Sequence, residues 1–506
     1  MALFTEAGVP PVRRLYSAAE NGELDRRAIE VHGIPGIALM RRAGKAAFRV
    51  ARRRWPDVRS LSIFCGRGNN AGDGYVIAGL ALSRGYAVQL LQVTDAADLA
   101  GDAGRARDWA LEQGVVIEAF APDVELRGEL IVDALLGTGL KGAVRAPFSA
   151  AIESINAAHD AGLPVLAVDL PSGLSADTGA ALGTAVRAVV TATFIGVKRG
   201  LLTGAGPAHA GDVHFDDLGV PAEVYTEAGA PAGIGLLELG TDGLRLARRP
   251  RDAHKGHYGH LLVVGGDCGM GGAVAMAAEA ALRTGTGLVS VATRGMHVPA
   301  ILMRTPEVMA HAVESRAALL PLLERATAVV IGPGLGRDPW GEQMLDAVLA
   351  CPLPLLLDAD ALNLLATRPE RRDHWVLTPH PGEAGRLLGS SAARVSEDRF
   401  AAVEALIARF GGAVVLKGAG TLVAADDGVA LSPYGNPGMA SGGMGDVLSG
   451  VVGGLLAQGL APHAAAALGA CLHGAAGDAA AAEGEAGMTA TDLMPHFRAL
   501  LSEAAE

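Results

Sequence analysis

Residues 436–450 read Asn-Pro-Gly-Met-Ala-Ser-Gly-Gly-Met-Gly-Asp-Val-Leu-Ser-Gly, and the C-terminal half of the chain is organised around them. The glycines permit close backbone approaches that a Cβ atom would block. The apolar run after Asp446 predicts the start of a buried helix. Backbone amides at a helix N-terminus bind phosphate or another anion. An anion-binding loop needs no carboxylate, so we predict that Asp446 transfers a proton to or from a substrate hydroxyl beside the phosphate.

The alternative is an ordinary glycine-rich turn in which Asp446 caps the helix. Two upstream loops favour the functional interpretation. They read Leu-Thr-Pro-His-Pro-Gly-Glu (377–383) and Leu-Lys-Gly-Ala-Gly-Thr (416–421), and each follows an apolar run that predicts a strand. Loops that follow successive strands lie at one edge of an α/β sheet. We therefore expect the three loops to form one ligand site.

Composition limits the possible partners and compartments. The chain has 506 residues, half of them hydrophobic, which is enough for two or three domains with large cores. A net charge of -12 leaves no basic surface for nucleic acid. The four cysteines form no C-x-x-C pair, and no secretory signal is visible in the first thirty residues, so a reducing, cytoplasmic compartment is expected. Residues 447–477 lack Asp, Glu, Lys and Arg, but Pro462, two histidines and seven glycines interrupt them, which predicts buried helices and no membrane span.

The N-terminal half alternates predicted strands and helices. Residues 1 to about 55 are predicted to be helical, from a polar periodic pattern at 17–30 and a one-sided apolar pattern at 36–53. A strand at 61–65, the loop Gly-Arg-Gly-Asn-Asn-Ala-Gly-Asp-Gly (66–74) and a helix to about residue 82 follow. This order is typical of nucleotide binding, although a dinucleotide fingerprint would not place so many side-chain oxygens in the loop. Further strands are predicted at 87–93, 130–135, 164–170 and 188–195. The alternation predicts a mostly parallel sheet.

Five polar residues at loops or strand ends of this half are candidates for chemistry. Asn70, Asp133 and Ser172 offer a carboxamide, a carboxylate and a hydroxyl, which suit a hard cation. Because only one of the three is charged, a monovalent ion is plausible. The alternative is that Asp133 and Ser172 cap the helices that follow. Lys141, flanked by glycines, and Asp169, at a strand end, are the acid and base candidates.

A linker is predicted at 226–245, where the pattern loosens, between domains at 1–225 and 246–506. The second domain is predicted to contain a helix at about 272–283. Its predicted strands are 261–264, 288–292, 328–331, 353–357 and 413–416. The predicted fold class is therefore α/β in both domains, and the two halves share no internal repeat.

Together the loops resemble those of a known two-domain repair family. Residues 1 to about 225 resemble the NAD(P)H-hydrate epimerase domain through the 66–74 loop, Val-Asp-Ala-Leu-Leu-Gly-Thr-Gly-Leu-Lys-Gly and Val-Asp-Leu-Pro-Ser-Gly. Residues from about 236 onward resemble the ADP-dependent NAD(P)H-hydrate dehydratase of the ribokinase-like superfamily. The motifs of that half are His-Lys-Gly, Gly-Pro-Gly-Leu-Gly, Thr-Pro-His-Pro-Gly-Glu, Lys-Gly-Ala-Gly-Thr and Gly-Met-Gly-Asp-Val-Leu-Ser-Gly. The implied fold is a Rossmann-like sheet with helices on both faces, followed by a ribokinase-like α/β domain.

The resemblance implies repair of the hydrates of NADH and NADPH (NADHX and NADPHX). The first domain would interconvert the R and S epimers. The second would phosphorylate the hydroxyl of the S hydrate and eliminate phosphate, which makes sense because phosphate leaves more readily than hydroxide. ADP, K+ and Mg2+ are the implied cofactors, with Mg2+ bound through phosphates and waters. Small-molecule substrates are expected as partners, with no nucleic acid and no membrane, and a homo-oligomer is expected.

The resemblance also implies roles for single residues. Asn70, Asp133 and Ser172 match the potassium ligands, and Lys141 and Asp169 match the proposed proton-transfer pair. The hydrate-binding positions of the first half are Asn69, Asn70, Ala71, Gly72, Asp73, Gly137, Thr138, Gly139, Leu140, Lys141, Gly142, Ala143 and Asp169. Those of the second half are Ala273, Gly334, His380 and Asp446, and the ADP-binding positions are Lys417, Gly418, Ala419, Gly420, Thr421 and Gly445. Ala71 stands where the family usually has glycine, and at a positive φ it would cost about 1 kcal/mol.

Two rival functions remain open at this point. A ribokinase-like kinase for small alcohols such as hydroxymethylpyrimidine would use the same Gly-Asp pair at 445–446. The Thr-Pro-His-Pro-Gly-Glu loop and the fused first domain argue against it. Alternatively, the first domain is a binding scaffold without catalysis. Lys141, Asp169 and the three cation-ligand candidates argue against that alternative.

Overall fold

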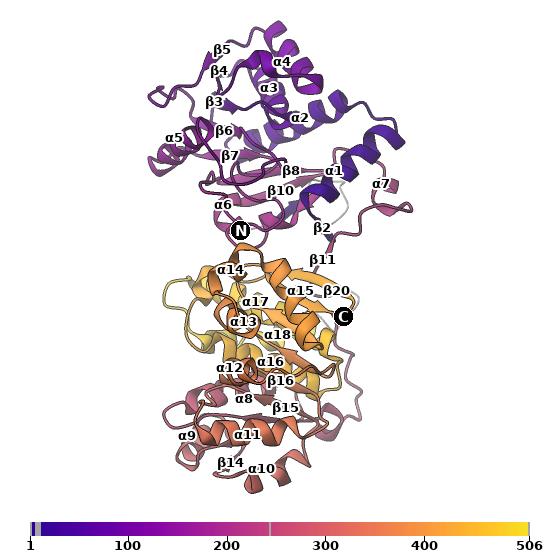
Figure 1. The fold of residues 1–506 in the computed structure, drawn as a ribbon, viewed down its shortest axis with the longest axis vertical. Coiled ribbons are helices and arrows are strands. Elements are labelled where there is room, and N and C mark those ends of the chain that lie inside the picture. The colour runs from indigo at the N-terminus through magenta and orange to yellow at the C-terminus, as the bar shows by residue number, and fades with distance from the viewer. Residues whose placement is uncertain (1–2, 6–11, 242–243, 504–506) are drawn as a thin grey trace. The chain divides into compact units, whose positions relative to one another are not determined.

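The computed structural model describes residues 3–5, 12–241 and 244–503. The chain divides into two compact units, unit 1 (residues 1–234) and unit 2 (residues 235–506), and each is an α/β sheet with helices on both faces (Figure 1). The predicted fold class is therefore confirmed. The division falls inside the predicted linker, where residues 234–236 form strand β11. The bounds of the linker at 226–245 stay a prediction.

Unit 1 contains a sheet in which every neighbouring pair of strands is parallel. The strand order is β1-β10-β8-β7-β6-β3-β4-β5. After β1 at one edge, the chain enters the middle of the sheet with β3, moves outward to β4 and β5, and returns to β6 on the other side of β3. Ligands bind at such a switch point, in the crevice outside the carboxyl ends of the strands. The strands are β1 (Leu3–Thr5), β3 (Ser60–Cys65), β4 (Ala87–Gln92), β5 (Ile117–Ala119), β6 (Leu130–Ala134), β7 (Val165–Val168), β8 (Val190–Phe194) and β10 (Asp212–Asp216).

Helices cover both faces of this sheet (Figure 1). One face packs against α2 (Gly36–Arg54), α3 (Asn69–Leu82) and α4 (Gly101–Glu112), and the other against α5 (Phe148–Asp160). All five residues of β6 are buried, as expected of a central parallel strand. The shorter helices are α1 (Ala18–Arg26), the π-helical turn Arg27–Val31, α6 (Gly206–Ala210) and α7 (Glu223–Thr226).

The prediction that residues 1 to about 55 are helical is confirmed for the patterns at 17–30 and 36–53, which form α1 with its π-helical turn and α2, but it was wrong for residues 3–5 and 14–16. Residues 3–5 form β1 beside β10, and β2 (Arg14–Tyr16) pairs with β9 (Val197–Lys198) outside the main sheet. Strands of three residues are too short to show a period, and their pairing partners lie about two hundred residues away in the sequence, so local pattern could not reveal them. Residues 1–2 and 6–11 of this prediction lie outside the described residues.

Unit 2 contains a second sheet of the same kind, with the order β14-β13-β12-β15-β16-β17-β18-β19-β20-β11. Its neighbours are parallel except for β19, which runs antiparallel to β18 and β20. The switch point lies between β12 and β15. The strands are β11 (Ile234–Leu236), β12 (His260–Val264), β13 (Leu288–Thr293), β14 (Met309–Ala312), β15 (Ala328–Ile331), β16 (Leu355–Leu357), β17 (Trp375–Leu377), β18 (Ala413–Leu416), β19 (Thr421–Ala425) and β20 (Gly428–Ser432).

One face of this sheet carries α8 (Gly271–Arg283), α16 (Met444–Ala457) and α17 (Pro462–Ala480). The remaining helices are α9 (Val298–Arg304), α10 (Arg316–Leu323), α11 (Pro339–Leu349), α12 (Ala359–Thr367), α13 (Pro381–Leu388), α14 (Ala392–Glu397), α15 (Arg399–Phe410) and α18 (Phe497–Glu503). The uncharged segment 447–477 thus forms two buried helices, as predicted. Among the helices in the described ranges, none is long and apolar enough to span a membrane.

Glycines let α16 pack unusually close to its neighbours. A Cβ atom at Gly453 would overlap a methyl group of Val330 on β15, and one at Gly450 would overlap the backbone of Ala277 on α8. The backbone of α16 is therefore in direct contact with β15 and α8, and this close packing fixes the position of the helix.

Candidate functional site

The candidate site of unit 2 begins at the N-terminus of α16. Gly443 precedes the helix with a φ of +93°, a conformation that favours glycine, and no described side chain caps the first turn. Asp446 lies in that first turn and is not the cap. The alternative in which Asp446 only caps the helix was therefore wrong. The uncapped amides remain available to an anion.

Four segments of the chain line one cavity of 420 Å³. Asp358 and Ala359 follow β16, His380 and Pro381 follow β17, Lys417 and Gly418 follow β18, and Gly443, Gly445 and Asp446 come from the start of α16. The predicted convergence of the three loops is confirmed by this cavity. The loop after β16 joins them because β16 lies next to β17 in the sheet.

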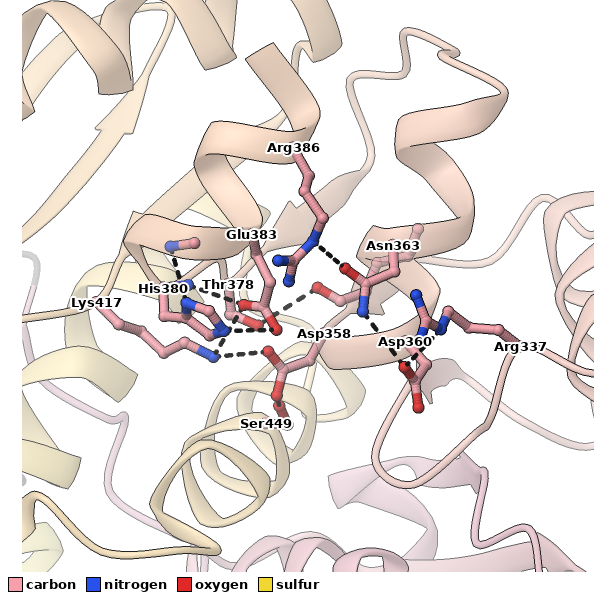
Figure 2. A network of polar contacts seen from close by, with 12 residues as sticks. Arg337, Asp358, Asp360, Asn363, Thr378, His380, Glu383, Arg386, Lys417 and Ser449 are labelled. Carbon is pink, nitrogen blue, oxygen red and sulfur yellow. Dashed lines mark hydrogen bonds and ion pairs between the residues drawn. The ribbon is translucent and has the colours of Figure 1, made fainter. Parts of the chain in front are cut away.

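A buried ion pair forms one wall of the cavity (Figure 2). Lys417 Nζ donates to Asp358 Oδ1 at 2.8 Å and lies 3.7 Å from Glu383 Oε2. Ser449 Oγ donates to the other oxygen of Asp358 at 2.8 Å. Burial alone would lower the pKa of Lys417, but the two carboxylates outweigh it and raise that pKa. Lys417 is therefore a fixed positive charge at the cavity.

Asp446 is the carboxyl group of this cavity that can change charge near neutral pH. Burial, together with the nearby negative charge of Asp358, raises its pKa to about 7, although Lys417 acts in the opposite direction. A Cβ atom at Gly445 would lie 3.3 Å from Lys417 Nζ and 3.5 Å from Asp358 Oδ2, so the backbone of α16 reaches the ion pair closely. A carboxyl group with this pKa suits general base catalysis.

His380 is the N-cap of α13 and contributes a neutral ring. Its Nδ1 accepts a hydrogen bond from Gly382 N at 2.9 Å, and Glu383 Oε2 accepts from His380 N at 2.8 Å. Burial lowers the pKa of His380. Because Nδ1 accepts, the neutral ring carries its proton on Nε2, which lies 3.4 Å from Glu383 Oε1.

Arg399, which sequence reasoning missed, shapes the loop 417–421. The buried guanidinium donates to the carbonyl oxygens of Leu416, Lys417 and Gly420 at 3.1, 3.1 and 3.2 Å. Burial lowers the pKa of Arg399 to about 10. Its hydrogen bonds hold the loop in one conformation. No local motif marks Arg399, whereas Asp358 could have been found from the Asp-Ala-Asp that follows a predicted strand.

Ala273 and Gly334 lie next to each other beside a second cavity. A Cβ atom at Gly334, whose φ is +55°, would lie 3.3 Å from that of Ala273 and 2.7 Å from that of Met270. Met270 lines the second cavity, of 580 Å³, together with Asp360 and Asn363. Asn363 of the second cavity donates to Asp360 at 3.3 Å and accepts at 2.6 Å from Arg386, which lies on the same helix as Glu383 (Figure 2).

In unit 1 the structure brings together Asn70, Asp133 and Ser172 at the switch point between β3 and β6. Asp133 accepts hydrogen bonds from Ser172 Oγ at 2.6 Å and Ser172 N at 2.8 Å. Asn70 Nδ2 donates to the carbonyl of Leu136 at 3.1 Å, and Leu136 N donates to Ser172 Oγ at 2.9 Å. The next helix, α5, begins only at Phe148, so the alternative in which Asp133 caps a helix was wrong. Ser172 likewise precedes no helix before residue 199.

The two segments predicted to bind the hydrate meet at this cluster, where a Cβ atom at Gly137 would lie 3.5 Å from the Cβ atom of Asn70. Residues 69–73 form the first turns of α3, and residues 137–143 form a partly exposed loop after β6. Ala71 is buried in the helix and is absent from the residues with positive φ. The strain expected of an alanine at positive φ is therefore absent, and alanine is well suited to the helix in which it lies.

Asp169 and Lys141 are not in contact in this structure. Asp169 follows β7 at a φ of +65°, and its Oδ1 accepts a hydrogen bond from the buried Lys198. Lys141 is exposed in the loop after β6, and the structure shows no ion pair between it and any described residue. Sequence reasoning missed Lys198. Its signal is a lone lysine that ends the apolar run Phe-Ile-Gly-Val (194–197).

Comparison with known proteins places both halves in one family. Models described as "NAD(P)H-hydrate dehydratase" and "YjeF-related protein N-terminus" match residues 261–498 and 36–200. The bifunctional NAD(P)H-hydrate repair enzyme of Coxiella burnetii is 48% identical over 495 residues, 96% of this chain and 99% of that protein. The Escherichia coli enzyme is 46% identical over 480 residues, 94% of this chain and 92% of that protein.

The chain belongs to the bifunctional NAD(P)H-hydrate repair enzymes. Membership in this family covers nearly the whole chain, so the resemblance inferred from the loops is confirmed for both halves. A small-alcohol kinase fused to a binding scaffold is not favoured. Among solved structures, the ADP/ATP-dependent NAD(P)H-hydrate dehydratase of Bacillus subtilis, co-crystallised with ATP and Mg2+, is 28% identical with a TM-score of 0.47, covering 53% of this chain and 99% of that chain.

Proposed function

We propose that unit 1 interconverts the R and S hydrates of NADH and NADPH, and that unit 2 dehydrates the S hydrate at the expense of ADP. The observation that carries the proposal is Asp446, a carboxyl group with a pKa of about 7 in a cavity that also contains Lys417 and an uncapped helix N-terminus. A base, a cation and free amides are the parts that phosphoryl transfer to a hydroxyl requires.

In the dehydration, Asp446 takes the proton of the substrate hydroxyl as its oxygen attacks the terminal phosphorus of ADP, and AMP leaves. The amides of α16 and the ammonium of Lys417 stabilise the negative charge that develops on the phosphoryl oxygens. The phosphate ester then breaks its carbon–oxygen bond, phosphate departs, and a proton lost from the neighbouring ring carbon restores the double bond. The sum is hydrate plus ADP giving NAD(P)H, AMP and phosphate.

The ADP site is proposed to consist of Gly445 and the loop 417–421 that Arg399 holds, with His380 toward the hydrate. Ala273 and Gly334 are proposed hydrate contacts of the same unit, near the second cavity. In the described part of the chain, no three His, Cys, Asp or Glu side chains gather so that they could hold a metal ion. Mg2+ would therefore be held by the phosphates of the nucleotide and by water, as is usual for this ion.

A monovalent cation, proposed to be K+, fits the cluster of Asn70, Asp133 and Ser172. The fit rests on Asn70 Oδ1, a buried oxygen without a hydrogen-bond partner in the structure, beside a carboxylate and a hydroxyl. An orphaned buried oxygen is costly unless something binds it. Bound there, the cation would supply positive charge that holds the loop after β6 against α3. That loop carries the proposed hydrate-binding residues 137–143.

For the epimerase, Asp169 is the proposed proton-transfer residue. Lys141 was predicted as its partner, and its exposed loop suits it to contact the hydrate. A homo-oligomer and a cytoplasmic location stay predictions.

Recovery of dihydronicotinamide absorbance from separate R and S hydrates of NADPH, with ADP or ATP present, tests these roles. The wild-type chain is expected to recover both epimers. Asp446→Ala should recover neither. Asp169→Ala should use S normally but R only as fast as it epimerises unaided. Asp426→Ala, an exposed aspartate of the β19–β20 turn, is the matched control and should behave as the wild type. Equal use of R by Asp169→Ala and the wild type would refute the role of Asp169.

A further inference from the structure

Lys198, which the proposed function has not used, is a buried cation with every donor occupied. It ends β9, and 1% of its side chain is exposed. Its Nζ donates to Asp169 Oδ1, to Thr193 Oγ1 at 3.2 Å and to the carbonyl of Phe194 at 3.1 Å. Burying an ammonium group costs several kcal/mol unless it is paired and hydrogen-bonded. Three acceptors match its three hydrogens, so the ammonium group is fixed in place.

The contacts of Asp169 are concentrated on one oxygen. Oδ1 accepts from Lys198, from Thr193 Oγ1 at 3.4 Å and from Phe194 N at 3.3 Å. Among the described residues, no hydrogen bond to Oδ2 is present, and 19% of the side chain is exposed. The backbone of Asp169 is held at a φ of +65°, which for a non-glycine residue costs about 1 kcal/mol or more and is common at functional sites. Lys198 therefore orients a carboxylate whose second oxygen is free for substrate.

Two further carboxyl groups lie close enough for their charges to interact with this pair. Asp25 comes from α1 and Asp73 from α3. Burial, opposed by Lys198 and reinforced by Asp169, raises the pKa of Asp25 to about 6. Burial also raises the pKa of Asp73 well above its usual range, with Asp169 and Asp25 acting in the same direction. The cluster thus places carboxyl groups with a raised pKa beside one that is paired with a cation, and carboxyl groups whose environments differ in this way can act as acid and base.

Packing holds α1, and with it Asp25, against the segment that carries Lys198. A Cβ atom at Gly196, two residues before Lys198, would lie 2.6 Å from Asn21 Oδ1 and 3.2 Å from Leu24 on α1. Asn21 Nδ2 in turn donates to Asp25 Oδ2 at 3.5 Å. Strand β2, which directly precedes α1, also contacts this segment: its Tyr16 pairs with Lys198 of β9. The helix is therefore a wall of the same polar cluster.

We propose that Lys198 is the positioning residue that holds Asp169 as the proton acceptor of the epimerase, and that Asp25 donates the matching proton. The proposal rests on the epimerase activity proposed for unit 1. Inversion of the hydroxyl-bearing carbon requires that its carbon–oxygen bond breaks and re-forms on the other face. The hydroxyl gains a proton from Asp25 as it leaves as water, and the water that adds loses a proton to Asp169. The roles exchange in the reverse direction, so protons balance and no oxidant is needed.

The test measures epimerisation alone, in the full-length chain. R-NADPH hydrate is supplied without nucleotide, and the ratio of epimers is followed by NMR. Lys198→Met is expected to lower kcat by about 100-fold or more while KM stays within about threefold, because it removes a group that acts through Asp169. Lys45→Met, which changes an exposed lysine of the same unit, is the matched control and should retain full activity. A kcat for Lys198→Met equal to that control would overturn the positioning role.

A second pair of variants tests Asp25. Asp25→Asn should lower kcat by about 100-fold with KM unchanged, and Asp25→Glu should recover part of the rate, since it restores the carboxyl group. Glu23→Gln on the same helix should have no effect, because Glu23 is paired with Arg26 at the surface. Equal rates for Asp25→Asn and Glu23→Gln would refute the role of Asp25.

Thr193→Val keeps the side-chain shape and the charges but removes one acceptor of Lys198, and about a tenfold loss of kcat is expected. This variant decides the positioning role if Lys198→Met does not fold. Failure of the wild-type chain to interconvert the epimers would instead remove the proposed epimerase function. Dehydration of the S hydrate with ADP should be unchanged in every variant, because none lies in unit 2.

Discussion

Replacing Asp446 with asparagine should make unit 2 inactive and more stable at the same time. Asparagine has nearly the same shape but cannot take a proton from the substrate, so the dehydration kcat should fall by about 100-fold or more. Stability should rise because the ionised carboxylate is desolvated and lies near Asp358, whereas a neutral amide avoids both costs. A residue that serves only the structure would not separate activity from stability in this way.

The size and the pH dependence of this gain in stability follow from the pKa of Asp446. This pKa is about 7 in the folded chain, against an ordinary value of 3.8. Between pH 3.8 and about 7, Asp446 keeps its proton in the folded chain but has released it in the unfolded chain. The free energy of unfolding of the wild type therefore falls as the pH rises through this range and stays lower above it. At 1.36 kcal/mol per unit the full shift corresponds to about 4 kcal/mol. Because the cavity is open to water, we expect about 1 to 3 kcal/mol.

Urea unfolding of unit 2 at pH 4.5 and pH 8.5 measures this difference. Asp446→Asn should match the wild type more closely at the lower pH and exceed it at the higher pH. Asp426→Asn, at an exposed turn, should show no such difference. A gain that is the same at both pH values, or a variant that keeps more than about a tenth of the wild-type kcat, would refute the assignment of Asp446 as a desolvated base.

Three further outcomes are expected. Arg399→Met should raise the KM for ADP by about tenfold with little effect on the KM for the hydrate in steady-state kinetics, because the loop 417–421 loses three hydrogen bonds. Asp358→Asn should shift the acid limb of the kcat–pH profile of dehydration to lower pH, because the negative charge of Asp358 raises the pKa of Asp446. Replacing K+ with Li+ should slow epimerisation but leave dehydration of the S hydrate unchanged, and Asn70→Leu should remove this dependence on the ion.

The sequence was sufficient for the central strands and for the loops that follow them. The strands at 328–331 and 413–416 were predicted with the bounds that the structure shows, because buried parallel strands are apolar runs and glycine-rich loops end them sharply. Since such loops gather at one edge of the sheet, adjacency in the fold could also be predicted. Asp446 and Lys417 were found for this reason.

Partners that the fold brings together from distant elements could not be predicted. Lys198 meets Asp169 only because β8 lies beside β7 and the chain turns back into β9. Arg399 binds backbone carbonyl groups, and because every residue has one, its partners cannot be recognised from the sequence. Lys141 was favoured by its flanking glycines, yet the same glycines place it in an exposed loop. Sequence reasoning therefore found loops that converge in the structure and missed the groups that support them.

The close packing of α16 makes the position of Asp446, the proposed base, sensitive to changes elsewhere on the helix. Gly453 lies seven residues beyond Asp446, about 10 Å along the helix axis. A methyl group added at Gly453 would overlap Val330 on β15 and push the helix away from the sheet. Because the helix is rigid, its N-terminal turn, which carries Asp446, would move with it. The position of Asp446, the proposed base, thus depends on a hydrophobic contact between Gly453 and Val330.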